Sequence, residues 1–179
     1  MYEAESFLSD CFEPQLKESR FSQEKTLLTL LLTLSCFQLK KLFYLTTMTT
    51  VLIVEDDPIN FRVFSKILTK RGGLQVKGTE IVEEVLQLAQ RREVDAILMD
   101  VALANSIYQG KPVDGIKITQ MLKSDPQTAS LPIVLVTAHA MEGDRENFLK
   151  QSGADGYISK PVVDHQEFID QIIALINKT

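Results

Sequence analysis

Short apolar runs alternate with longer amphipathic stretches from Thr50 to the end of the chain. The runs are rich in Val, Ile and Leu, and continuous apolar runs are typical of strands that are buried on both faces of a parallel sheet. They predict five strands, at Val51–Val54, Leu74–Thr79, Ala96–Met99, Ile133–Thr137 and Tyr157–Ser159.

The stretches between these runs carry helix signals. Asp57-Pro58 places a capping residue before a proline suited to a first turn, and Gly72-Gly73 can end that helix. Asp164 and Glu167 have the spacing of a capping box. Apolar residues at helical spacing predict helices at Ile81–Ala89, Ile116–Leu122 and Phe168–Ile176. A further helix, Glu142–Gln151, is expected to end before Gly153. Five such units predict an α/β fold, a doubly wound parallel sheet with helices on both faces.

Residues 1–47 differ from the rest, with no Gly and one Pro. Their apolar stretch Thr26–Phe37 is too short to span a bilayer, and lysines follow it where a signal peptide has small residues. Three interpretations stay open: a peripheral amphipathic helix, a partner-binding extension, or sequence that is not native to the protein. The third is favoured because Met48 directly precedes the first predicted strand. We therefore expect an N-terminal extension, 1–47, and one compact domain, 48–179.

The net charge and the few cysteines and histidines argue against several classes of function. The net charge is −5 and no basic tract exceeds two residues, which argues against direct nucleic-acid binding because phosphate neutralisation needs clustered Lys and Arg. Cys11 and Cys36 lack a metal-binding spacing and fit a reducing, cytoplasmic setting. With only two histidines, a His-rich metal site is excluded.

Charged and hydroxyl side chains follow the predicted strands. Ligands of doubly wound sheets bind at the carboxyl ends of the strands, so these residues are expected to meet. Because neighbouring carboxylates repel one another, a hard cation such as Mg²⁺ is the expected compensator. The charged and hydroxyl residues at the strand ends are Glu55, Asp56 and Asp57 after the first strand, Asp100 at the third, Thr137 at the fourth and Lys160 after the fifth.

This residue set suits phosphoryl transfer, which depends on positioning and charge neutralisation. Asp100 is the candidate nucleophile, since a carboxylate can form an aspartyl phosphate. Lys160 would supply a positive charge and Thr137 a hydrogen bond to the phosphoryl oxygens. Each residue alone also has an ordinary structural explanation, and Asp57 is expected to be only a helix cap; the combination at the strand ends favours the functional interpretation.

Four segments carry a resemblance to the receiver domains of two-component response regulators, over about Thr50 to Asn177. They are Val-Leu-Ile-Val-Glu-Asp-Asp-Pro ending at Pro58, Ile-Leu-Met-Asp100, Val-Thr137-Ala138 and Gly-Tyr-Ile-Ser-Lys-Pro ending at Pro161. The resemblance implies a stand-alone, chemotaxis-regulator-like domain with the flavodoxin-like strand order 2-1-3-4-5. It also implies the site: Mg²⁺ held by Glu55, Asp56, Asp100 and the Ala102 carbonyl, phosphorylation of Asp100, a switch formed by Thr137 and Tyr157, and the phosphate-binding lysine Lys160.

The chain departs from the family pattern after the third strand. Ala104 stands where the family usually has Pro, and nine residues, Asn105–Val113, separate it from Asp114-Gly115, a longer connection than is usual. We expect a surface loop, which is either a tolerated insertion or a partner-selecting, lid-like element. His139, two residues after Thr137, is either a shield for the phosphoryl group or an ordinary surface histidine.

The resemblance implies a signalling phosphoacceptor rather than an enzyme with turnover. Its expected partners are a histidine kinase or histidine phosphotransfer protein and a downstream target protein, because no output module follows the fifth helix. Two alternative functions are a phosphatase and a docking scaffold. A haloacid-dehalogenase-type phosphatase needs an Asp-x-Asp pattern that Glu55-Asp56-Asp57 lacks, and a pseudo-receiver docking scaffold would not need every charged site residue.

Overall fold

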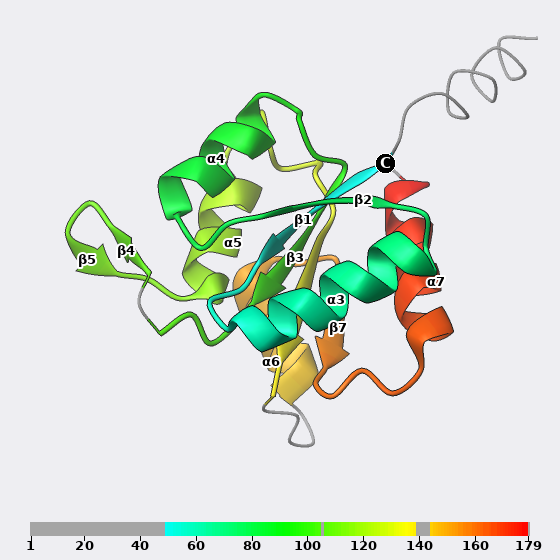
Figure 1. Ribbon diagram of the computed structural model, residues 1–179. Coiled ribbons are helices and arrows are strands. Elements are labelled where there is room, and N and C mark those ends of the chain that lie inside the picture. The colour runs from blue at the N-terminus through cyan, green and yellow to red at the C-terminus, as the bar shows by residue number, and fades with distance from the viewer. Residues whose placement is uncertain (1–48, 105, 139–143, 179) are drawn as a thin grey trace, which may run out of the picture. The chain divides into compact units, whose positions relative to one another are not determined.

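A five-stranded parallel sheet forms the centre of the domain (Figure 1). The computed structural model describes residues 49–104, 106–138 and 144–178, so the extension 1–47, Met48, Asn105 and His139 lie outside the described residues. The strands of this sheet run in the order β2-β1-β3-β6-β7, which is the expected order 2-1-3-4-5. Their bounds are β1 Thr50–Val54, β2 Gln75–Gly78, β3 Ala96–Asp100, β6 Ile133–Thr137 and β7 Gly156–Ser159.

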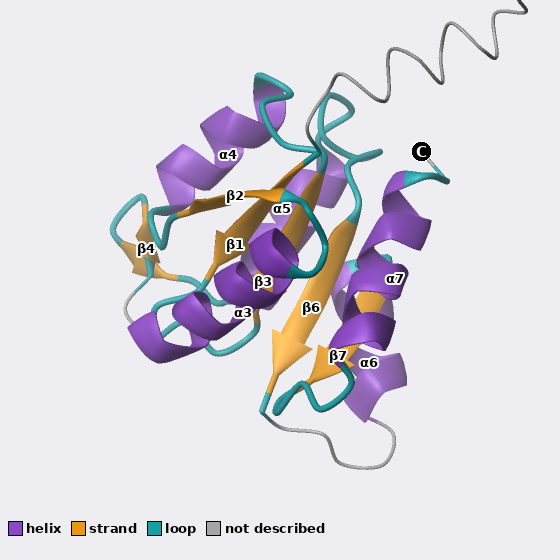
Figure 2. Cartoon of the chain, turned by 45° about the vertical axis from the view of Figure 1, so that its right-hand side comes forward, coloured by secondary structure: helices purple, strands orange, loops and turns teal. Residues whose placement is uncertain are grey.

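Helices cover both faces of the sheet, as predicted (Figure 2). The helices α3 (Pro58–Lys70) and α7 (His165–Ile176) pack on one face, and α4 (Val82–Gln90), α5 (Gly115–Ser124) and α6 (Asp144–Ser152) pack on the other. None of the helices within the described ranges combines the length and apolar character that a bilayer crossing requires.

The three central strands, β1, β3 and β6, have both faces buried, which explains their continuous apolar sequences. Successive side chains of a strand point to opposite faces. In β1, Val51 and Ile53 join the apolar cluster under α3 and α7, whereas Leu52 and Val54 join the cluster under α4 and α5. Every residue of β1, β3 and β6 is buried. The strand β2 at the sheet edge is partly exposed and shorter than the predicted Leu74–Thr79, since only one neighbouring strand pairs with it.

The predicted capping residues Asp57 and Asp164 lie at the first turns of α3 and α7, the helices that follow β1 and β7. The Asp57 carboxylate accepts from the backbone N–H of Ile59 and caps α3. Asp164 accepts from the N–H groups of Gln166 and Glu167 and caps α7. These interactions satisfy N–H groups that lack partners inside a helix, and so they fix where each helix leaves the strand before it.

The insertion after β3 lies at the surface, as predicted, but it forms a β-hairpin where an irregular loop was expected. Its strands, β4 (Ile107–Tyr108) and β5 (Lys111–Pro112), pair antiparallel. The two turn residues, Gln109 and Gly110, have φ of 52° and 74°, the left-handed conformation that a tight two-residue hairpin turn requires. Tyr108 packs against the cluster under α4 and α5, which holds the hairpin on the domain.

Candidate functional site

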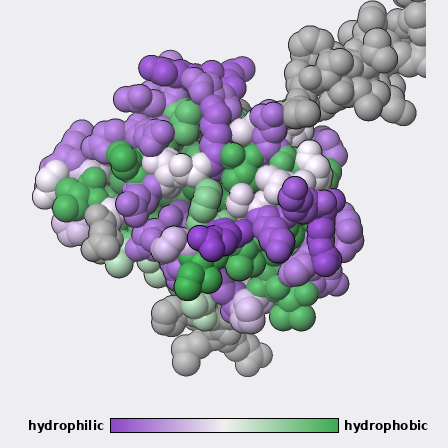
Figure 3. All heavy atoms as spheres, viewed as in Figure 1, coloured by the Kyte–Doolittle hydropathy of each residue, from purple (hydrophilic) through white to green (hydrophobic). Residues whose placement is uncertain are grey.

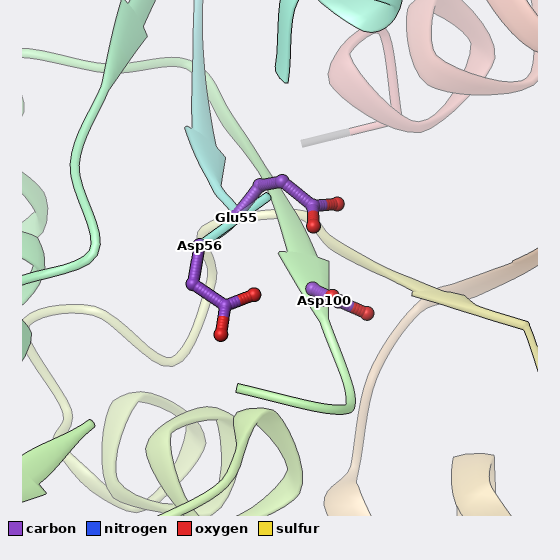
Figure 4. A group of neighbouring side chains, drawn as sticks. All are labelled: Glu55, Asp56 and Asp100. Atoms are coloured by element: carbon purple, nitrogen blue, oxygen red, sulfur yellow. The ribbon is translucent and has the colours of Figure 1, made fainter. Parts of the chain in front are cut away.

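Three carboxylates meet where β1 and β3 end (Figure 4). These strands are neighbours in the sheet, with Val54 opposite Met99, so Glu55 and Asp56 emerge beside Asp100. One carboxylate oxygen from each of the three residues lies within 4.8 Å of the other two. Hard oxygen ligands in such a group are the kind that Mg²⁺ uses, and the donor set therefore fits this cation.

Lys160 brings a positive charge to the acidic group from the end of β7. Its ammonium nitrogen lies 2.7 Å from Glu55 Oε2 and 3.1 Å from Asp100 Oδ2. The Lys160 backbone N–H donates to the Thr137 carbonyl at 2.7 Å, and its ammonium lies 5.8 Å from the centre of the Phe64 ring. The ammonium offsets part of the repulsion between the carboxylates, and it is placed to neutralise further negative charge at Asp100.

Glu55 is the most buried carboxylate of the group, with a side chain only 2% exposed. Its Oε1 accepts from the Asp57 backbone N–H and from Asn60 Nδ2, both at 3.3 Å. Burial raises the pKa of Glu55 above its ordinary value, the hydrogen bond from Lys160 opposes the rise, and the Asp100 carboxylate adds to it. Glu55 thus keeps a proton to higher pH than an exposed glutamate does.

The segment after β3 is tied to the site at both ends. Asp100 is buried, and its Oδ1 accepts from the Ala102 backbone N–H at 3.3 Å. Two residues further on, the Ala104 N–H donates to Asp56 Oδ2 at 2.9 Å. Gly115 packs directly on the backbone of Asp100, because a Cβ built on it would lie 2.8 Å from the Asp100 carbonyl carbon and closer still to the oxygen. The Asp100 main chain therefore has little room to move.

Thr137 and Tyr157 lie on one face of the sheet, the face covered by α4, α5 and α6. Thr137 ends β6 and is 1% exposed. Tyr157 pairs with Leu135 across β6 and β7, and Leu135 lies two residues before Thr137, so strand alternation puts all three side chains on that face. The half-buried Tyr157 ring stacks on Phe148 of α6, with ring centres 6.2 Å apart.

The structure brings together every charged residue predicted for the site. It adds Asn60, Phe64 and Gly115, which sequence reasoning missed as parts of the site. Asn60 and Phe64 look like ordinary residues of an amphipathic helix, and nothing in the sequence marks their proximity to Glu55 and Lys160. The Asp114-Gly115 pair is visible in the sequence, but the close approach of Gly115 to Asp100 is a tertiary contact.

Known proteins resemble the chain over most of this domain. A family model of the response regulator receiver domain matches residues 51–173. The polar-differentiation response regulator DivK of Brucella ovis is 36% identical over 113 residues, which cover 63% of this chain and 85% of DivK.

Solved structures of receiver domains also resemble this chain. The receiver domain of a sensor histidine kinase from Pseudomonas aeruginosa, solved with a magnesium ion in its active site cleft, is 30% identical with a TM-score of 0.58, over 72% of this chain and 99% of that one. A CheY-like receiver domain protein from Methanospirillum hungatei has a TM-score of 0.59 at 21% identity, over 74% and 96% of the two chains, and supports the fold alone. The chain belongs to the family of response regulator receiver domains.

Proposed function

We propose that the chain accepts a phosphoryl group on Asp100 from a phosphohistidine of a histidine kinase or phosphotransfer protein. The observation that carries the proposal is the convergence of Glu55, Asp56 and Asp100 with the Lys160 ammonium at the carboxyl edge of the sheet. Family membership favours this signalling role over two alternatives. A haloacid-dehalogenase-type phosphatase needs an Asp-x-Asp pattern that Glu55-Asp56-Asp57 lacks, and a docking scaffold would not need every charged site residue.

In the proposed reaction, an Asp100 carboxylate oxygen attacks the phosphorus atom. A P–O bond forms as the P–N bond to the donor imidazole breaks, and the imidazole leaves and takes up a proton. Lys160, 3.1 Å from Asp100 Oδ2, neutralises charge on the phosphoryl oxygens. Glu55, Asp56, Asp100 and the Ala102 carbonyl would hold Mg²⁺, which when bound supplies the remaining charge neutralisation.

The phosphorylated domain would signal through Thr137 and Tyr157. Phosphoryl oxygens are strong acceptors, and the Thr137 hydroxyl can turn toward one of them. That movement changes the space beside β6 on the face that Tyr157 shares. A different position of the Tyr157 ring alters the surface formed by α6, β7 and α7, and a target protein with different affinities for the two surfaces would read the change.

Phosphotransfer from radiolabelled histidine kinases tests the first step. With Mg²⁺ present, the wild-type chain should take up label, and Asp100→Asn should take up none. A retained signal in Asp100→Asn would contradict the assignment of Asp100.

In this proposal residues 48–179 form the receiver domain and residues 1–47 form an extension. Because the proposed partner is a histidine kinase, the proposed location of the domain is the cytoplasm.

A second measurement tests the switch. Beryllofluoride, a mimic of the phosphoryl group, should shift the NMR resonances of Tyr157 and α6 in the wild-type chain. Thr137→Ala should still accept phosphate while losing these distant shifts, and Thr137→Ser, which keeps the hydroxyl, should retain them. Shifts that stay at Asp100 in the wild-type chain would contradict the mechanism.

A further inference from the structure

The hairpin forms one wall of a cavity beside the acidic group. This cavity has a volume of about 230 Å³ and is lined by Asp56, Glu80, Ile81, Val82, Ser106 and Ile107. Ile107 is 62% exposed and Ile81 is 56% exposed, so two large apolar side chains meet water at its rim. Figure 3 shows apolar surface at the hairpin, in the region that Figure 1 labels β4 and β5.

The hairpin directs Ile107 away from the core and leaves it exposed. Tyr108 packs into the core cluster, and because neighbouring side chains of a strand point to opposite sides, Ile107 faces outward. At the base of the hairpin the Val113 N–H donates to the Ser106 carbonyl at 3.0 Å, and Ser106 Oγ donates to the Glu80 carbonyl at 3.4 Å. Ile107 is thereby positioned next to the β2–α4 connection that carries Ile81.

The cavity adjoins the proposed phosphoacceptor site through one shared residue, Asp56. Asp56 lines the cavity and also belongs to the acidic group, with a carboxylate oxygen within 4.8 Å of one from Asp100. A protein that brings a phosphohistidine to Asp100 must cover the surface around Asp56. The exposed apolar residues beside Asp56 would then lie against the part of the donor protein that surrounds its phosphohistidine.

We propose that Ile107 and Ile81 bind an apolar side chain of the phosphodonor protein, next to its phosphohistidine. The hairpin is then a specificity element that distinguishes protein donors and has no part in the chemistry at Asp100. This inference rests on the proposed function, since it requires phosphoryl transfer to Asp100.

Small and protein phosphodonors separate docking from chemistry. Acetyl phosphate needs no docking surface, so it should label the wild-type chain, Ile107→Ser and Ile81→Ser at equal rates. The protein donors are the histidine kinases and phosphotransfer proteins of the source genome, each purified and labelled on histidine, and the fastest donor to the wild-type chain serves as the probe. The kcat/KM of this donor should fall about tenfold in Ile107→Ser. Burying an exposed isoleucine side chain against the donor contributes about a factor of ten to the affinity, and serine loses that contribution. Ile107→Val, which keeps the apolar surface, should stay close to the wild-type rate.

Each outcome decides a different point. Failure of acetyl phosphate to label the wild-type chain would contradict the proposed function itself. Normal acetyl phosphate labelling with equal protein transfer to Ile107→Ser and wild type would overturn the docking inference alone. Normal acetyl phosphate labelling with no transfer from any protein donor would overturn the docking inference and would also contradict the phosphohistidine donor of the proposed function. Loss of self-association in Ile107→Ser, measured by light scattering, with transfer unchanged would show that the surface pairs two copies of the chain and would also overturn it.

Discussion

Gly115→Ala should slow phosphorylation of Asp100 without removing any group that takes part in the reaction. The added Cβ would lie 2.8 Å from the Asp100 carbonyl carbon and 3.0 Å from Met99 Cγ. Carbon atoms pack best at about 3.5–4.0 Å, so the main chain at Asp100 or the start of α5 must shift by roughly 1 Å.

Two effects of different size follow from that shift. Overpacking of this kind typically lowers the free energy of unfolding by about 1–3 kcal/mol. A displacement of about 1 Å at a reacting group can lower a rate by about 100-fold. Phosphorylation should therefore suffer much more than stability, and the folded variant should label slowly with acetyl phosphate and Mg²⁺.

Gly153→Ala is the matched control. Gly153 has a φ of 76°, so an alanine there is strained by about 1–2 kcal/mol, yet its Cβ would make only ordinary contacts with Lys123 at 3.7 Å. The control should lose similar stability and keep the wild-type rate of labelling, measured by intact-protein mass spectrometry over time. Wild-type labelling by folded Gly115→Ala would refute the argument that Gly115 positions Asp100.

Three further predictions concern the metal, the pH and the extension. Mg²⁺ at ten times its Kd should stabilise the wild-type chain by about 1.4 kcal/mol, and Asp56→Ala should lose the matching rise in Tm; an unchanged rise would place the metal elsewhere. Because the pKa of Glu55 is raised in the folded chain, its proton stabilises the fold fully below the ordinary value of 4.5, and this contribution is lost as pH rises through the folded pKa. Urea unfolding without Mg²⁺ should show a weaker decline of stability with pH in Glu55→Gln than in wild type, and equal declines would contradict the burial argument. A chain shortened to begin at Met48 should match the full chain in unfolding free energy and labelling rate, and a large loss of either would show that residues 1–47 belong to the domain.

The sheet could be predicted from the sequence because its central strands are buried on both faces. Each apolar run of β1, β3 and β6 has one structural solution in a doubly wound fold, and the strand order followed from the family resemblance. The hairpin was missed because its strands have two residues each and its turn is Gln109-Gly110, which is a weaker signal than Asn-Gly.

The charged residues of the site could be predicted because each follows a strand, and strand ends meet at one edge of the sheet. The sequence does not predict which of these side chains contact one another. The 2.7 Å contact between Lys160 and Glu55 joins residues that are 105 positions apart, and the hydrogen bond from Asn60 to Glu55 depends on how α3 leaves β1. Such contacts depend on side-chain directions, which a pattern of residue types does not encode.

Chemical trapping of the phosphorylated residue would identify the phosphoacceptor without reference to any partner protein. After treatment with acetyl phosphate and Mg²⁺, borohydride reduces an aspartyl phosphate to homoserine, and peptide mass spectrometry locates the converted residue. Homoserine should appear at position 100 and at no other aspartate, and none should appear in Asp100→Asn. Conversion of Asp56 or Asp57 in place of Asp100, or no conversion in the folded wild-type chain, would contradict the assignment of Asp100 as the phosphoacceptor.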